Sequence, residues 1–160
     1  MTSQEDELQD ETSSVPNKDT ARCHMLGEPI AQLFPEMSQA QLQLISPTAL
    51  AYLGDAVYEL YIRRFYLLPP QRPEAYHHLV VSQVRAETQA EILQSLYPYL
   101  RSTELEIVRK GRNAATGRPK RLDPVTYQQA SSLETLIGYL YLSDFQRLAE
   151  LLQKLQLEKS

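Results

Sequence analysis

The stretch "ALAYLGDAVYELYIRR", Ala49 to Arg64, has the composition of one long helix with a glycine and an aspartate at its centre. Ser46 and Pro47 precede it and form a typical helix start, because a serine hydroxyl caps the first turn and proline fits there. We therefore predict a helix from Pro47 to about Tyr66. Glycine inside a helix costs about 1 kcal/mol relative to alanine, so its presence needs an explanation.

The apolar residues of this stretch predict which side of the helix faces the core. Three- and four-residue spacing, typical of a core-facing side, is shown by Leu50, Leu53, Val57 and Leu60 (or Tyr61). Asp55 falls roughly opposite, where most carboxylates are solvated surface groups. Two features favour a functional acid instead. Gly54 allows close approach of another backbone or a ligand, and Tyr52 and Tyr58 make this side unusually apolar.

The rest of the sequence predicts further helices. We expect one over about 74–96 with an interruption near Ser82, and one from a capping box at Thr103-x-x-Glu106 to about Lys110, with Gly111 close to its exit. Two more should follow, one after the cap Asp123-Pro124 and one from Ser143 onward. No segment alternates with the period of a strand, and no internal repeat is present. The predicted fold class is an all-α helical bundle.

Length and composition define the broad class of protein. A chain of 160 residues with 42% hydrophobic and 22% charged residues suits one globular domain with a proper core. The single cysteine, Cys23, excludes an internal disulfide and a metal cluster held by cysteines alone. No apolar run approaches the ~20 residues of a membrane span, and an acidic N-terminus is unlike a targeting peptide. We therefore predict a cytoplasmic protein.

Charge is unevenly distributed along the chain. Residues 1–20 hold six acids and one base, a net charge of −5, although the whole chain carries only −4. We predict that residues 1–26 form an acidic disordered tail and that residues 27–160 form the folded domain. The segment from Arg109 to Arg121 holds six bases and no acid. Such asymmetry is compatible with nucleic-acid binding.

The basic segment "VRKGRNAATGRPKRLDP" has two interpretations. It could be an exposed loop whose charges only interact with solvent. It could also follow a phosphate backbone, because arginine forks bind phosphate oxygens in pairs and glycines keep a loop adaptable. The candidate nucleic-acid ligands are Arg109, Lys110, Arg112, Asn113, Arg118 and Lys120.

Glu134, in "SSLETLIGYLYL", is a second acid within an apolar helix, four residues before Gly138. By itself it is most simply a solvated or capped acid. If folding brought it beside Asp55, the two carboxylates could bind a hard cation such as Mg²⁺, which prefers oxygen ligands and keeps several waters. Other common sites are missing from the sequence: His77 and His78 are adjacent and make a poor metal pair, and no phosphate-binding glycine loop or serine-nucleophile elbow occurs.

Three segments, in this order, resemble the ribonuclease III family, and most closely its short bacterial branch, Mini-ribonuclease III, which lacks a double-stranded-RNA-binding domain. They are "ALAYLGDAVYE" (Ala49 to Glu59), "VRKGRNAATGRPK" (Val108 to Lys120) and "YQQASSLETLIGYLYL" (Tyr127 to Leu142). The resemblance implies that residues 27–160 form a ribonuclease III-like catalytic domain. It also implies an all-α homodimer with a valley for double-stranded RNA between its protomers.

The resemblance also implies roles for individual residues. Asp55 matches the aspartate of the family's L-G-D-A-V signature, and Glu134 matches the glutamate on its later helix. Both are thereby implied to be catalytic and to hold Mg²⁺ for hydrolysis of RNA to 5′-phosphate and 3′-hydroxyl ends. Gly54 would serve close helix packing around the acid. The short branch further implies a precursor of large-subunit (23S) ribosomal RNA as substrate, with a ribosomal protein as a candidate partner.

This chain departs from full-length ribonuclease III, which has acids where Thr48, Ala51 and Ser131 stand here. The short branch shares this reduced set, so we expect water to complete the coordination of one or two metal ions. Two rival functions are a noncatalytic RNA-binding or ribosome-assembly module of the same fold, and a helical interaction protein without an RNA role. Retention of Asp55 and Glu134 argues against the first. The second predicts that neutralising the basic segment leaves its affinity unchanged.

Overall fold

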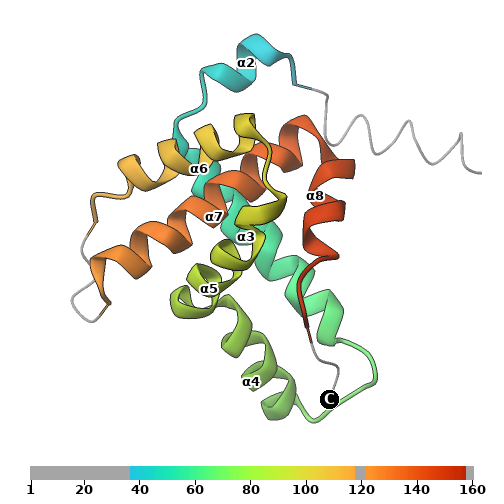
Figure 1. The fold of residues 1–160 in the computed structure, drawn as a ribbon. Helices are drawn as coiled ribbons and strands as arrows, with labels where there is room; N and C mark the ends of the chain where they lie inside the picture. Colours follow the sequence, from blue (N-terminus) through green and yellow to red (C-terminus); the bar gives the residue numbers. More distant parts are fainter. Residues whose placement is uncertain (1–36, 118–121, 158–160) are drawn as a thin grey trace, which may run out of the picture. The chain divides into compact units, whose positions relative to one another are not determined.

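The computed structural model describes residues 37–117 and 122–157, and within these ranges it contains helices and no strand. In chain order they are α2 (Gln39–Gln43), α3 (Pro47–Tyr66), α4 (Pro73–Val84), α5 (Ala86–Leu96), the 3-10 helix η1 (Tyr97–Tyr99), α6 (Ser102–Ala114), α7 (Pro124–Ser143) and α8 (Phe145–Leu152) (Figure 1). The predicted all-α fold is confirmed. The predicted tail, residues 1–26, lies outside the described residues, as do Arg118 and Lys120.

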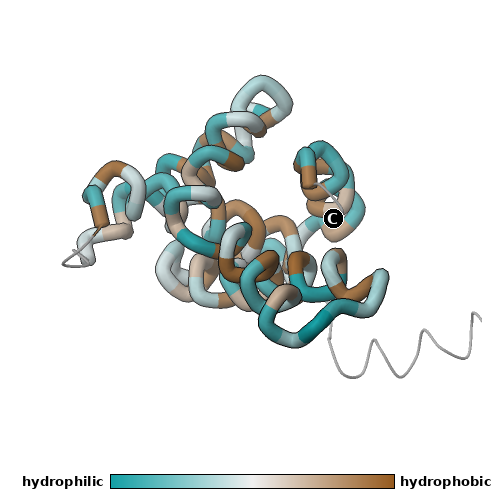
Figure 2. The backbone as a smooth tube through the Cα atoms, turned by 90° about the horizontal axis from the view of Figure 1, so that it is seen from below, coloured by the Kyte–Doolittle hydropathy of each residue, from teal (hydrophilic) through white to brown (hydrophobic). Residues whose placement is uncertain are grey.

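Helix α7 is the centre of the domain. It packs against α3, α5, α6 and α8 and is buried nearly all round, which explains why its sequence is apolar on every side (Figure 1). The largest fully buried side chains are Tyr58, Ile62, Leu93, Leu133, Leu136 and Leu148. Figure 2 shows the apolar positions gathered where the helices meet. None of the described helices is long and apolar enough to cross a membrane.

The two long helices begin as predicted. The Ser46 hydroxyl accepts a hydrogen bond from the Ala49 N–H at 3.1 Å, and an Asp123 carboxylate oxygen accepts one from the Thr126 N–H at 3.0 Å. In each case proline occupies the first turn, where its missing N–H has no cost. Strong capping residues therefore predicted both starts correctly.

Three other boundaries were predicted incorrectly. The interruption between α4 and α5 lies at Arg85, which is extended, and not near Ser82. Helix α6 begins before Thr103, and its early acid is Glu104, whose carboxylate accepts the Arg101 N–H at 2.8 Å. Helix α8 is capped by Asp144, so the predicted start is displaced by one residue. The N-caps of α5 and α6 are arginines, Arg85 and Arg101, which are not typical capping residues, so a search for capping residues does not find these starts.

The predicted core-facing side of α3 is also corrected. The buried row is Leu50, Gly54, Tyr58, Ile62 and Tyr66, at steps of four residues. Leu60 is 67% exposed, and Leu53 and Val57 are half-buried. A glycine and two tyrosines in the row hid it from a search for aliphatic side chains. Residues at steps of four form a ridge along a helix, and here that ridge meets α7.

A buried ion pair joins α8 to α6. Arg147 Nε donates to Glu104 Oε1 at 2.7 Å, and Arg147 Nη2 donates to the Tyr99 carbonyl at 2.7 Å. Burial alone would raise the pKa of Glu104, but hydrogen bonds from Arg147 and Arg101 hold it below its usual value. The sequence analysis did not identify this pair, because charged residues in exposed and buried positions look the same in sequence. It fixes α8 and η1 to α6.

Candidate active site

The two glycines singled out in the sequence lie at the crossing of α3 and α7. A Cβ atom placed on Gly54 would lie 1.8 Å from the Glu134 carbonyl oxygen, and one on Gly138 would lie 2.0 Å from the Leu50 carbonyl oxygen. Only a residue without a side chain fits at either position, so the backbones are in direct contact. Close helix packing, predicted for Gly54, is confirmed.

This crossing brings Asp55 and Glu134 together from positions 79 residues apart in sequence. Asp55 directly follows Gly54 and is exposed, whereas Glu134 is half-buried. Burial, followed by the nearby charge of Asp55, raises the pKa of Glu134 to about 7. Burial and the charge of Glu59 also raise the pKa of Asp55. The site therefore concentrates negative charge that lacks a full counter-charge.

Glu59, whose negative charge helps to raise the pKa of Asp55, has a cationic partner of its own. Arg63 forms an ion pair with Glu59 one turn earlier on the same helix, and its Nε donates to Glu59 at 2.9 Å. Its guanidinium therefore offsets the charge of Glu59 more directly than that of Asp55. An additional cation could still relieve the repulsion between Asp55 and Glu134.

The donor set fits a magnesium ion. Mg²⁺ is usually held by one or two carboxylates together with waters and substrate phosphates, so two acids at a solvent-accessible position suffice. Within the described ranges, no group of three or more histidine, cysteine, aspartate or glutamate side chains is placed to hold a metal. A softer metal that requires several histidine or cysteine ligands would find no such set among these residues.

Sequence analysis missed one residue of this site, Gln89 of α5. Its side chain is only 1% exposed, and its hydrogen bonding to Glu134 partly opposes the rise in the pKa of that acid. Its Nε2 donates to the Val84 carbonyl at 3.0 Å. A buried glutamine on an otherwise amphipathic helix was the available signal, but burial could not be assigned from the sequence.

The basic residues lie at the end of α6. The helix passes through Gly111 and continues to Ala114, so Arg109, Lys110, Arg112 and Asn113 are helical, and the predicted exit near Gly111 is wrong. The continuation is possible because Gly111 packs against α7: a Cβ there would lie 2.5 Å from the Thr135 hydroxyl. Arg109 is paired with Glu106 at 2.5 Å, which makes it a weaker candidate for an external ligand.

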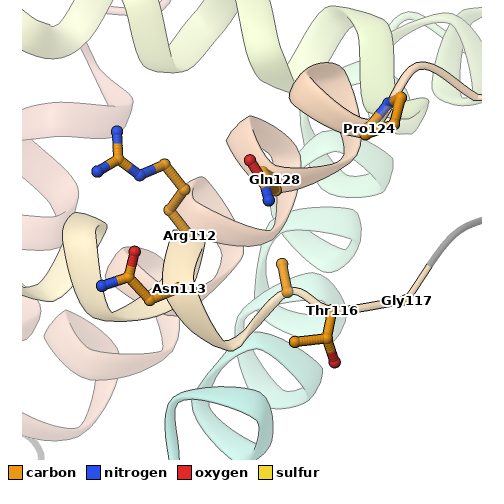
Figure 3. Close-up of a pocket in the computed structure, with 7 residues that line it drawn as sticks. Arg112, Asn113, Thr116, Gly117, Pro124 and Gln128 are labelled. Atoms are coloured by element: carbon orange, nitrogen blue, oxygen red, sulfur yellow. The ribbon is translucent and has the colours of Figure 1, made fainter.

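Arg112 and Asn113 border a polar hollow between the end of α6 and the start of α7 (Figure 3). Its volume is about 520 Å³, and the rest of the described lining is Ala115, Thr116, Gly117, Pro124 and Gln128. A guanidinium and two amides offer several hydrogen-bond donors to one ligand. Such a hollow suits phosphate and sugar groups better than an apolar ligand. Gln128 was not among the predicted binding residues.

Comparisons with known proteins identify the family of this chain. A family model of the Ribonuclease III domain matches residues 48–144, which span α3 to α7. A protein of Synechocystis sp. named Mini-ribonuclease 3 is 59% identical over 116 residues, covering 72% of this chain and 81% of that protein. The Mini-ribonuclease 3 of Synechococcus sp. is 58% identical over 119 residues, covering 74% and 86%. A crystal structure from Fusobacterium nucleatum is 28% identical, with a TM-score of 0.64, and covers 68% and 90%.

Proposed function

Because the chain belongs to the ribonuclease III domain family, in its Mini-ribonuclease 3 group, it is an endoribonuclease, and we propose that Asp55 and Glu134 form its active site. The substrate is double-stranded RNA, and the cofactor is Mg²⁺. One observation carries the assignment of residues: the glycine crossing of α3 and α7 places these two acids side by side.

The two acids have different roles in the proposed site. Glu134, half-buried and in contact with Gln89, is the fixed member, whereas Asp55 is exposed and reaches the substrate side. The chemistry that Mg²⁺ supplies when bound is activation of a water and neutralisation of phosphoryl charge. Both carboxylates must be ionised to hold the ion, so its binding opposes the raised pKa of Glu134. The products are 5′-phosphate and 3′-hydroxyl ends.

The hollow at the end of α6 serves RNA recognition in this proposal. Arg112, Asn113 and Gln128 bind phosphates and 2′-hydroxyls, because side chains cannot read the narrow major groove of A-form RNA. Arg118 and Lys120, which follow in the sequence, add positive charge to the same segment, as do Lys110 and Arg109. The natural substrate is a precursor of 23S ribosomal RNA, and a ribosomal protein could present it. The site of action is the cytoplasm.

A homodimer completes the proposal. One acidic pair per chain hydrolyses one strand, so cleavage of both strands needs two chains. The outer side of α3 offers an apolar surface for this contact, since Tyr52 is 85% exposed and Leu60 is 67% exposed. Large apolar side chains that are exposed close together often mark a protein–protein interface. The molar mass in solution tests the dimer, and Leu60→Lys should convert it to monomers.

The main experiment is cleavage of a long structured RNA with and without Mg²⁺, comparing the wild type with Asp55→Asn. This substitution keeps the size of the side chain but removes its anionic oxygen. Mg²⁺-dependent cleavage by the wild type alone would support the proposal. Equal cleavage by both proteins would contradict the role of Asp55. Absence of cleavage by either, with RNA still bound, would favour a noncatalytic RNA-binding module.

A further inference from the structure

Gln89 is an unusual residue for the interior of this domain. Its side chain is 1% exposed, and burying an amide is costly unless its polar atoms are hydrogen-bonded. One end of the amide is satisfied, since Nε2 donates to the Val84 carbonyl at 3.0 Å. The other end, Oε1, has no hydrogen-bond partner within the described part of the chain. Buried polar atoms without a partner are rare and often mark a place for water or an ion.

The segment that holds this amide is itself firmly fixed. The Val84 carbonyl lies at the break between α4 and α5, next to the extended residue Arg85. The Tyr58 hydroxyl donates to the neighbouring Gln83 carbonyl at 3.3 Å, and the Thr88 hydroxyl donates to the Ser82 carbonyl at 2.7 Å. Gln89 is therefore attached to a rigid part of the backbone and cannot easily turn away.

The Gln89 amide also lies next to Glu134 of the acidic pair. Helix α5 packs against α7, and a hydrogen bond from the Gln89 side chain to the Glu134 carboxylate lowers the pKa of that acid. An amide nitrogen carries two hydrogens, so it can bind Val84 and Glu134 together. A leucine or methionine would fill the same space without leaving an unpaired oxygen. The glutamine thus has a cost that packing alone does not explain.

We propose that Gln89 is a positioning residue for the metal site: anchored by Val84, its amide fixes the Glu134 carboxylate, and Oε1 accepts a hydrogen bond from a water that the bound ion retains. The inference rests on the function proposed above, because it requires that Asp55 and Glu134 hold the ion. Mg²⁺ loses its waters reluctantly, so a site with few carboxylates needs acceptors for the hydrogens of those waters. Residues that orient metal ligands in this way typically contribute 10- to 100-fold to affinity or activity.

The test compares the wild type with Gln89→Met, which keeps the length of the side chain and removes both polar atoms. Gln94→Met, on the exposed side of the same helix, is the matched control. The first readout is Mn²⁺ binding to the RNA-free protein, measured by titration calorimetry. The second is the Mg²⁺ concentration for half-maximal cleavage, measured together with the KM for RNA. Circular dichroism and the Tm of the metal-free proteins show whether each variant is folded.

We expect Gln89→Met to weaken Mn²⁺ binding about tenfold and to raise the half-maximal Mg²⁺ concentration similarly. Its KM for RNA should not change, and excess Mg²⁺ should restore most of kcat. Gln89→Asn keeps an amide but holds it one methylene group farther from Glu134, so it should also weaken Mn²⁺ binding. It replaces the methionine variant if that variant does not fold. In a Glu134→Gln background, Gln89→Met should weaken Mn²⁺ binding no further, because the two residues act together.

Two results would overturn the inference in distinguishable ways. If Gln89→Met lowers only the Tm and binds Mn²⁺ as the wild type does, Gln89 is structural and the proposed active site still stands. If the wild type itself binds no Mn²⁺ and Asp55→Asn cleaves RNA normally, the metal site is wrong and the proposed function fails with it.

Discussion

Gly54 and Gly138 lie against each other across the crossing of α3 and α7. A Cβ on Gly54 would lie 2.8 Å from the Gly138 nitrogen, and a Cβ on Gly138 would lie 3.1 Å from the Gly54 nitrogen. Their contact is therefore reciprocal, and each helix supplies the space that the other needs. The acids Asp55 and Glu134 are one and four residues away from these contacts, so the crossing that stabilises the fold also assembles the site.

Gly54→Ala should destabilise the protein by about 3 kcal/mol or more, because the new methyl group meets backbone atoms that cannot move independently. Gly111→Ala should cost less, about 1–2 kcal/mol, since its Cβ first meets the Thr135 side chain. Urea unfolding followed by circular dichroism measures both. Ala56→Gly, on the exposed side of α3, should cost about 1 kcal/mol and is the control. A Gly54→Ala midpoint equal to that of the wild type would contradict the direct helix contact.

Glu134→Gln should stabilise the metal-free protein at pH 8 and have little effect near pH 4.5. The folded pKa of about 7 is above the ordinary value of 4.5, so the protonated acid favours folding at low pH and ionisation removes this stability as the pH rises. At about 1.4 kcal/mol per pKa unit, the gain at pH 8 should reach about 1–3 kcal/mol. Tm measurements across this pH range in a chelator test it, with Glu91→Gln as a charge control. A difference that is constant with pH would be evidence against burial of Glu134.

Arg147→Met should destabilise the protein by about 3–5 kcal/mol, because it leaves the Glu104 carboxylate buried without its partner. Glu104→Leu combined with Arg147→Met should recover most of the loss, since an apolar pair of similar volume needs no counter-charge. In the wild type, the lowered pKa of Glu104 means that this pair stabilises the fold at neutral pH and ceases to do so as acid protonates it. A double variant as unstable as the single one would show that the pair itself is indispensable.

Arg112→Ala should weaken RNA binding at low salt and reduce the slope of log affinity against log salt by about one. The assay uses double-stranded RNA and the Asp55→Asn background, so that cleavage does not interfere. Lys154→Ala removes one charge at a different surface, where the ammonium lies 4.3 Å from the centre of the Tyr99 ring, and it should leave the slope unchanged. Equal slopes for the two variants would mean that the hollow does not contact phosphate.

The sequence predicted the elements better than their packing. Ser46-Pro47 and Asp123-Pro124 marked two helix starts correctly, because capping is a local interaction that neighbouring residues determine. The buried row of α3 was missed because its key member, Gly54, has no side chain and lies against backbone atoms of α7. A pattern of apolar side chains cannot reveal such a contact. Gln89 was missed for a related reason: only tertiary structure distinguishes a buried amide from a surface one.

Helix α7 contacts Gly54 and Gly111, the glycines that directly precede the proposed site residues Asp55 and Arg112. Gly54 packs at the Glu134 carbonyl, and Gly111 packs at Ser132 and Thr135. These contacts lie within three residues of one another, which is about 5 Å along a helix axis. The backbone that carries Arg112 and the backbone that carries Asp55 are thus set at a fixed separation by one rigid rod. If Arg112 binds a phosphate and Asp55 acts at the cleaved bond, as proposed, α7 would set how far from that phosphate the RNA strand is cut.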